Sequence, residues 1–449
     1  MQQEYTAMAI DDFDIGAPDT EADNHALAVR HGGRWWPRDL LVGLIFLASC
    51  LAYTDRVNIS VAALAMQHEF GWSQTQKGFA LSSFFIGYML CLLLSGWFAT
   101  RFGGKRLLGL AVIVWSVCTL LTPAAGAVSM AALVVVRIAM GIGESAVFPS
   151  AFEIVGRSIP PNERTRATAR ILSGIPIGQV AGLVITAWIL AHYAWPAAFY
   201  SFGAIGLIWA LVWFRFITHK PIARPHGSLK MPEMLYASAK PVQSGEPLPW
   251  RRLLVSAPIW ALVSGHFASN WTLYVLLAWL PSYFREELHL SIASAGMFSA
   301  GPWLTAAVVT NLAAPFSDRL ISSGFSVTAT RKLMQCSGLL ISGGLLLAIR
   351  DVHSPSVALV LLCAATGALG LTWCGYAPGL IDVAPRHSAL VSGFTNTIAT
   401  IPGIVGVAVT GWLLDVTGTY SAAFILTAVI SVLSATVFGL FFSARPLIN

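Results

Sequence analysis

Two of the long apolar segments of this 449-residue chain carry a pair of charged residues well away from their ends. Asp55 and Arg56 occur in the segment at about 40–66, and Arg137 and Glu144 in the segment at about 128–156. Placing an arginine at the centre of a membrane-spanning helix costs roughly 2.5 to 3.5 kcal/mol of insertion free energy. Such an arginine therefore indicates a functional site or a buried partner. The planar guanidinium matches a carboxylate or phosphate through two parallel hydrogen bonds. We therefore expect Arg56 to bind an anion.

A structural interpretation of Arg56 is that it only pairs with Asp55 and holds helices together. Neighbouring residues on a helix point about 100° apart, so the Asp55 and Arg56 side chains are poorly placed to satisfy each other's charge and hydrogen bonds. Tyr53, Arg56 and Ser60 share one helix face, the pattern of a polar stripe that lines a cavity.

A second stripe contains Arg137, Gly141, Glu144 and Phe148. Two turns, about 10 Å, separate Arg137 from Glu144, so the two need not form one closed pair. Desolvation in an apolar, partly wet cavity favours the protonated form of Glu144, which suits a proton carrier. The alternative is a structural ion pair between Glu144 and an arginine on another helix. Asp55 is the second candidate for proton coupling.

Other polar groups fall in the middle of apolar segments. They are Tyr88, Asn270, Tyr274 and Asn396. Each lines a substrate cavity or makes an interhelical hydrogen bond worth about 0.6 to 2 kcal/mol, and for Asn270 the two interpretations weigh equally. His266, near an interface, and His387, in a connection, are interpreted as structural.

The composition predicts an all-α membrane protein. Apolar residues make up 56% and charged residues 11% of the chain, and the mean hydropathy is +0.70, whereas soluble domains carry roughly 25% charged residues. A spanning helix needs about 20 mainly apolar residues. Twelve segments meet this need, at about 40–66, 77–100, 105–124, 128–156, 167–190, 196–217, 253–283, 293–317, 332–350, 355–381, 388–413 and 420–443.

The basic residues alternate with these segments. Of the 27 Lys and Arg, 22 lie at the N-terminus, at the C-terminus or in every second connection, and only Lys77, Arg285 and Arg350 lie on the other side. The positive-inside rule therefore predicts that both termini are cytoplasmic. Topology explains the net charge of +6 better than nucleic-acid binding does.

The predicted domains are two six-helix bundles. An acidic, disordered cytoplasmic tail (1–38) precedes the first bundle (39–217), a proline-rich cytoplasmic linker (218–252) joins it to the second (253–443), and a short cytoplasmic tail (444–449) follows. Two halves of six spans are typical of a rocking transporter with its site between the halves. The six cysteines lie in spans without CxxC spacing, so we expect them to bind no metal. We also expect no cofactor and a monomeric protein.

Six motifs occur in a fixed order from about Tyr53 to Ala423. They are Tyr53-Thr-Asp-Arg-Val-Asn58, Arg137-Ile-Ala-Met-Gly-Ile-Gly-Glu144, Phe148-Pro149, Pro161-Asn-Glu-Arg164, His266-Phe267 with Asn270-Trp271, and Thr395-Asn-Thr-Ile-Ala-Thr-Ile-Pro402. Together they resemble the anion:cation symporter family of the major facilitator superfamily, which includes bacterial sugar-acid (galactonate) transporters, plant plastid anion transporters, sialin and the vesicular glutamate transporters. The resemblance implies the major facilitator fold and places Tyr53, Tyr88 and Asn396 in the substrate cavity with Arg56. Thr100 stands where the superfamily's loop after the second span has an aspartate.

The predicted function is proton-coupled import of a small organic anion, a carboxylate or sugar acid, by alternating access. The alternative is a sodium-coupled transporter of phosphate or another inorganic anion. Gly104-Lys105-Arg106 does not fit the pattern of a phosphate-binding loop, which excludes an ATP-driven pump. The sequence also has no cluster of nucleophile and base, or of metal ligands, that would indicate an enzyme. The remaining alternative is a sensor that resembles a transporter but does not transport. An uptake assay distinguishes such a sensor from a carrier. Short external loops favour a bacterial inner membrane.

Overall fold

A computed structural model describes residues 38–217, 255–385 and 387–446, and every regular element in these ranges is helical. Most of the predicted N-terminal tail, the linker at 218–252 and the last three residues of the C-terminal tail lie outside the described residues.

The N-terminal bundle contains seven helical elements. They are α2 (Arg38–Phe70), α3 (Gln74–Phe102), α4 (Gly104–Val128), α5 (Met130–Glu144), α6 (Val147–Ser158), α7 (Pro161–His192) and α8 (Pro196–Phe216). The C-terminal bundle contains α10 (Ala257–Glu286), α11 (Ile292–Ser322), α12 (Val327–Ile349), α13 (Pro355–Leu371), the short 3-10 helix η2 (Thr372–Cys374), α14 (Tyr376–Val383), α15 (Ser388–Thr417) and α16 (Ser421–Phe441).

Within the described residues, ten helices are long and apolar enough to cross a membrane, or eleven if α3, bent by 53°, counts as one span. The 30-residue α10 falls outside this count. Its central turns carry His266, Ser269, Asn270 and Thr272, whose polarity lowers the hydropathy of the helix. Twelve spans therefore remain a prediction, as does the cytoplasmic placement of both termini.

One span in each half is broken at the corresponding position. The span predicted at 128–156 divides into α5 and α6 at Ser145–Ala146, directly after Glu144. The span predicted at 355–381 divides into α13 and α14 around η2. Interrupted helices in matching positions of two halves point to a transporter binding site.

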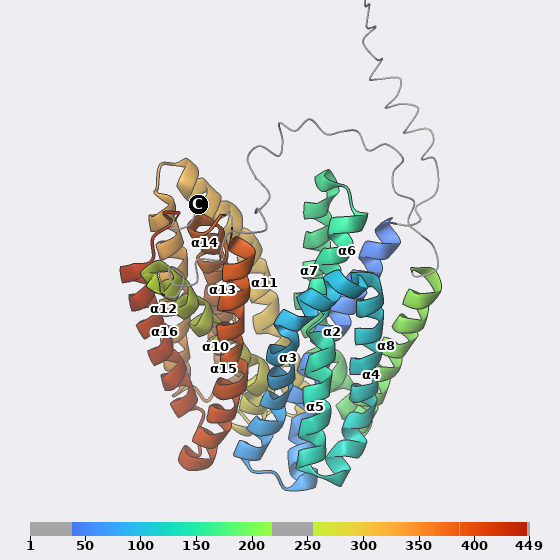
Figure 1. The fold of residues 1–449 in the computed structure, drawn as a ribbon. Helices are drawn as coiled ribbons and strands as arrows, with labels where there is room; N and C mark the ends of the chain where they lie inside the picture. The colour runs from blue at the N-terminus through green and yellow to red at the C-terminus, as the bar shows by residue number, and fades with distance from the viewer. Residues whose placement is uncertain (1–37, 218–254, 386, 447–449) are drawn as a thin grey trace, which may run out of the picture.

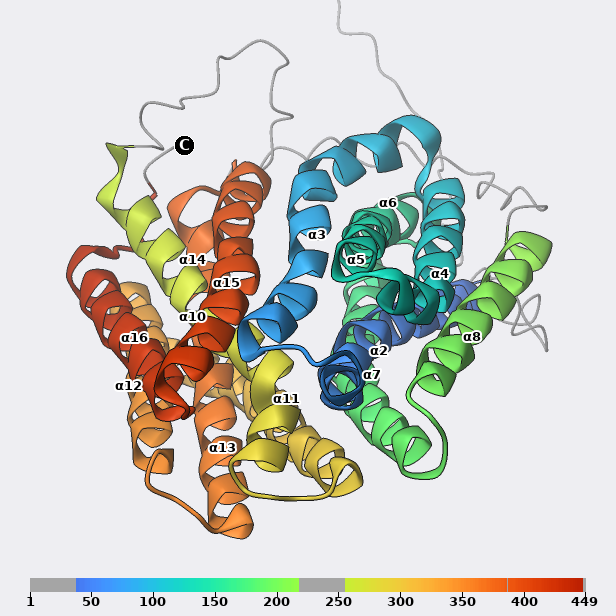
Figure 2. The same cartoon turned by 90° about the horizontal axis from the view of Figure 1, so that it is seen from below.

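The two bundles lean together at one end and diverge at the other (Figure 1). The diverging end carries the connections α3–α4, α6–α7 and α11–α12, which hold the basic residues of the sequence pattern, and we call it the basic end. The other end is the closed end. Seen from below, α3 lies beside α15, and α7 lies beside α11 (Figure 2).

Two glycines allow α3 and α5 to approach closely. A methyl group at Gly87 would collide with the carbonyl oxygen of Ile138, and one at Gly141 would collide with the carbonyl oxygen of Phe84. Gly141 thus serves helix packing, and the close approach brings the aromatic face of α3 against the charged stripe of α5.

Candidate functional site

The centre of the site is an ion pair between α2 and the end of α5. Nη2 of Arg56 donates a hydrogen bond to Oε2 of Glu144 at 3.0 Å, and both side chains are almost fully buried. The sequence left open that Arg56 pairs with Asp55, or that Glu144 pairs with an arginine on another helix. The structure shows the second arrangement. Nε of Arg56 and Oε1 of Glu144 have no hydrogen-bond partner among the described residues, so each group retains capacity to bind something else.

Three aromatic rings surround the Arg56 guanidinium. Its central carbon lies 4.6 Å from the ring centroid of Tyr53, 4.7 Å from that of Phe84 and 4.8 Å from that of Tyr88. Cation–π contacts of this kind stabilise a desolvated arginine without neutralising its charge. Arg56 therefore remains available to an anion although it is buried.

Arg137 and Asp55 are buried near this pair without an ion-pair partner among the described residues. The guanidinium of Arg137 donates to the sulfur of Met140 at 3.2 Å and lies 5.4 Å from the ring centroid of Phe84. Among the described residues, Asp55 accepts a long hydrogen bond from Asn58 at 3.5 Å, and its other oxygen has no partner within hydrogen-bonding distance. The site thus holds two cations and two carboxylates, of which one pair is closed.

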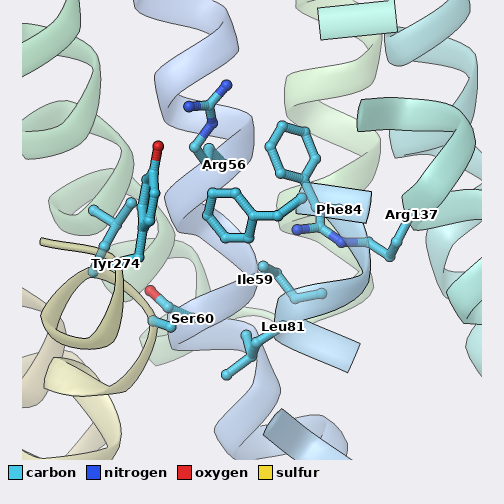
Figure 3. Close-up of a pocket in the computed structure, with 10 residues that line it drawn as sticks. Arg56, Ile59, Ser60, Leu81, Phe84, Arg137 and Tyr274 are labelled. Atoms are coloured by element: carbon cyan, nitrogen blue, oxygen red, sulfur yellow. The ribbon is translucent and has the colours of Figure 1, made fainter. Parts of the chain in front are cut away.

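A small pocket adjoins Arg56 on the side of the closed end (Figure 3). Its polar lining residues are Arg56, Ser60, Arg137 and Tyr274, and its apolar lining residues are Ile59, Leu81, Phe84, Phe85, Leu277 and Ala278. Tyr274 comes from the C-terminal bundle and the charged residues come from the N-terminal bundle. The pocket therefore lies between the two halves, as the two-bundle prediction requires.

The predicted residues of the C-terminal bundle have different surroundings. Tyr274 packs against Phe85 with ring centroids 4.5 Å apart. In Figure 3 the hydroxyl end of Tyr274 is the end nearer to Arg56. Asn270 donates from Nδ2 to the carbonyl oxygen of Ala399 at 2.7 Å, which is the interhelical hydrogen bond that the sequence left open. Asn396 is half-buried on α15. Of these three, Tyr274 joins the Arg56 site directly.

Sequence reasoning missed Phe84 and Phe85, since aromatic residues in an apolar span are usually core residues. The contact of α3 with α5, and of Phe85 with Tyr274, places them at the site instead. Within the described ranges, no group of three or more His, Cys, Asp or Glu could hold a metal ion.

A second polar cluster joins the two bundles at the closed end. The buried Nζ of Lys77 on α3 lies 2.6 Å from Oε1 of Glu286 on α10. Oε2 of Glu286 accepts hydrogen bonds from the Tyr420 hydroxyl at 2.7 Å and from Nε2 of Gln74 at 3.1 Å. The carboxylate of Asp415 accepts the backbone N–H groups of Gln74 and Thr75 at the start of α3, at 2.9 and 2.7 Å. We call Gln74, Lys77, Glu286, Asp415 and Tyr420 the closed-end cluster.

Replacing Lys77 by methionine should release the closed end. The variant leaves Glu286 without its cation, and removal of one partner of a buried pair is strongly destabilising. Allowing for the partial exposure of Glu286, we expect a loss of about 2 kcal/mol, or roughly 30-fold in the equilibrium between closed and open forms.

The measurement is labelling of a cysteine at Ser60 from the closed-end side by a membrane-impermeant thiol reagent, in a chain whose six native cysteines are serines. Labelling should rise several-fold in Lys77→Met. Arg350→Met, which breaks the exposed Arg350–Asp351 pair within one bundle, is the control and should change nothing. Equal labelling of both variants would remove the cluster from control of the closed end.

Comparison with known proteins identifies the family of this chain. Residues 45–407 match the Major Facilitator Superfamily. Among curated relatives, the chain is 35% identical to "Sodium-dependent phosphate transport protein 1, chloroplastic" of Arabidopsis thaliana, over 92% of this chain and 82% of that protein. It is 33% identical to "Ascorbate transporter, chloroplastic" of Arabidopsis thaliana, over 94% and 78% of the two chains. It is also 33% identical to "Probable anion transporter 4, chloroplastic" of Oryza sativa subsp. japonica, over 97% and 75%.

Among solved structures, a bacterial homologue of the human lysosomal transporter Spinster, in an inward-facing and occupied conformation, superposes with a TM-score of 0.75. It shares 18% sequence identity, and the match covers 91% of this chain and 97% of that one. At this identity the likeness concerns the fold alone. The matched residues, the two bundles and the curated relatives agree: this multi-pass membrane protein belongs to the Major Facilitator Superfamily, in which it groups with the plant plastid anion transporters.

Proposed function

We propose that the protein is a secondary active transporter that imports a small organic anion together with protons. The observation that carries the proposal is the buried Arg56–Glu144 ion pair, 3.0 Å long and placed beside the pocket between the bundles. A fixed cation whose counter-ion can accept a proton is suited to exchange that counter-ion for a substrate anion.

In the binding step, a substrate carboxylate takes the place of Glu144 at Arg56. The planar fork can hold both carboxylate oxygens, and Tyr53, Tyr88 and Tyr274 can orient the anion through their hydroxyls. The buried Arg137 supplies a second positive charge to the same region.

In the coupling step, the displaced Glu144 loses its only hydrogen-bond partner among the described residues and stays in a nearly dry environment. The charged form is then disfavoured, so Glu144 takes up a proton. Asp55, buried with an unpartnered oxygen, is the second proton carrier in this proposal. Two protons with one monovalent anion make transport electrogenic. The net charge adds roughly 2.3 kcal/mol per 100 mV to the driving force, and the pH gradient contributes about 1.4 kcal/mol per pH unit for each proton.

The bundles support alternating access by rocking about the site. They meet through the closed-end cluster and diverge at the basic end (Figure 1). Breaking the cluster and closing the basic end gives the opposite conformation, as in other transporters built from two such halves.

A sodium-coupled phosphate transporter is the second candidate, because one close relative is named a sodium-dependent phosphate transport protein. Another relative is named an ascorbate transporter, so names alone do not decide between organic and inorganic substrates. The relatives' names also indicate chloroplasts and give no support to the bacterial inner membrane that the sequence suggested.

Uptake into proteoliposomes separates the two candidates. An inwardly directed proton gradient without sodium should drive accumulation of an organic anion, whereas a sodium gradient at equal pH on both sides should not. Dependence on sodium, with phosphate as the accumulated ion, would establish the second candidate in place of the first. Empty liposomes and the Arg56→Lys variant are the controls.

A further inference from the structure

A buried histidine of the C-terminal bundle has no role in the site described above. His266 on α10 is 8% exposed, and its ring stacks on Tyr376 with centroids 4.3 Å apart and an interplanar angle of 17°. Among the described residues no group hydrogen-bonds to either ring nitrogen, and Nδ1 is enclosed without a partner. Because an unsatisfied buried polar group costs about 1 to 3 kcal/mol, it requires an explanation.

His266 lies on the stripe of α10 that leads to the Arg56 site. His266, Asn270 and Tyr274 recur every four residues and so share one face of the helix. The amide nitrogen of Asn270 is engaged with α15, and Tyr274 lines the pocket beside Arg56. Among the described residues, His266 is the member of this stripe with an enclosed ring nitrogen that lacks a partner.

Tyr376 lies at the interruption of its span. It is the first residue of α14, directly after the break in its span. Tyr376 is 3% exposed, and its ring centroid also lies 5.7 Å from that of Trp373. The stacked pair of His266 and Tyr376 thus joins the interruption of this span to the stripe of α10 that carries Tyr274.

The pair is held in place by Gln335 on α12. Its Nε2 donates to the carbonyl oxygen of Gly265 and to Oγ of Ser269, and its Oε1 accepts the backbone N–H of Tyr376, each at 3.2 Å. The break before α14 is therefore fixed to α10 beside His266, which pre-organises both rings.

We propose that His266 and Tyr376 form a subsite that recognises a hydroxyl group on the body of the transported carboxylate. A neutral imidazole offers one donor and one acceptor nitrogen, and a hydroxyl can serve either of them. Eight residues along α10, about 12 Å, separate His266 from Tyr274, and the Tyr274 side chain covers part of this length. A carboxylate bound at Arg56 needs a body of several bonds to reach the subsite, which inorganic phosphate lacks.

This inference rests on the proposed organic-anion function, and binding to the purified full-length protein tests both. The probes are gluconate and hexanoate, six-carbon monocarboxylates that differ in their hydroxyls, and inorganic phosphate. Isothermal titration should show that the wild type binds gluconate more tightly than hexanoate. His266→Phe keeps a ring on Tyr376 and removes both nitrogens, so gluconate affinity should fall at least 10-fold and hexanoate affinity less than 3-fold.

Two further variants keep the test decisive. Tyr376→Phe removes only a hydroxyl and should also weaken gluconate selectively, and His353→Phe, at an exposed position, should change neither affinity. A wild type that prefers hexanoate, or variants that lose both acids equally, would overturn the subsite and leave the organic-anion function standing. Binding of phosphate alone, or of none of the three probes, contradicts the organic-anion function itself.

Discussion

Replacing Arg56 by lysine weakens binding of the transported anion by roughly 10- to 150-fold, the expected effect of losing one charge-assisted hydrogen bond worth about 1.5 to 3 kcal/mol. The lysine ammonium keeps the positive charge but is a strongly hydrated point charge that cannot form two parallel hydrogen bonds to a carboxylate. It also lacks the flat face that Tyr53, Phe84 and Tyr88 contact. The dissociation constant of the purified protein, measured by titration calorimetry, gives the effect directly.

Arg170→Lys is the matched control for this prediction. Arg170 makes an exposed pair with Asp39 at 3.2 Å, and exposed pairs contribute little, so binding should be unchanged. If Arg56→Lys binds the anion within 3-fold of the wild type, the anion site lies elsewhere.

Glu144→Gln separates exchange from accumulation. The neutral amide mimics the protonated acid and can still accept from Arg56, yet it cannot release a proton. Removing the carboxylate also frees positive charge at Arg56, so anion binding should be retained or become tighter. We expect exchange across the membrane to continue, while accumulation driven by a proton gradient at zero potential falls well below that of the wild type, because Asp55 alone can carry at most one proton with the anion.

Counterflow and gradient-driven uptake in the same proteoliposomes measure the two activities. Glu163→Gln is the control, since Glu163 is half-exposed and lies 3.8 Å from Arg38. It should retain both activities. Proton-driven accumulation by Glu144→Gln equal to that of the wild type would exclude Glu144 from coupling.

The charged residues of the site could be predicted from the sequence, but their pairing could not. An arginine in an apolar span is costly wherever the helix packs, so Arg56 stands out from composition alone. Its partner Glu144 is 88 residues away, and only the packing of α2, α3 and α5 brings the two together. Helical geometry did show that Asp55 is a poor partner, and the structure agrees.

The positions of the spans follow from hydropathy, whereas their interruptions need other signals. The sequence predicts single spans at 128–156 and 355–381, and the structure interrupts both. Pro149 has no N–H, and its ring clashes with the carbonyl group of Ser145 four residues earlier, so the first interruption has a local signal that hydropathy does not register. The 2.6 Å hydrogen bond between the hydroxyls of Ser95 and Ser145 adds a tertiary contact there.

Lys77 illustrates a different limit of the sequence. At the start of an apolar segment it reads as a loop residue that marks topology, and it counts among the few basic residues of its side. Its burial results from the docking of α10 and α15 against α3, a contact between halves of the chain that no local pattern encodes.

Proton movement on addition of the organic anion tests the central claim most directly. Wild-type proteoliposomes in sodium-free medium, held at zero potential, should make the external medium more alkaline as the anion enters, with more than one proton per monovalent anion. Glu144→Gln proteoliposomes should exchange the anion without changing the external pH. Anion entry into wild-type proteoliposomes with no proton movement, or entry only after sodium is added, would contradict exchange of Glu144 for substrate at Arg56 as the basis of coupling.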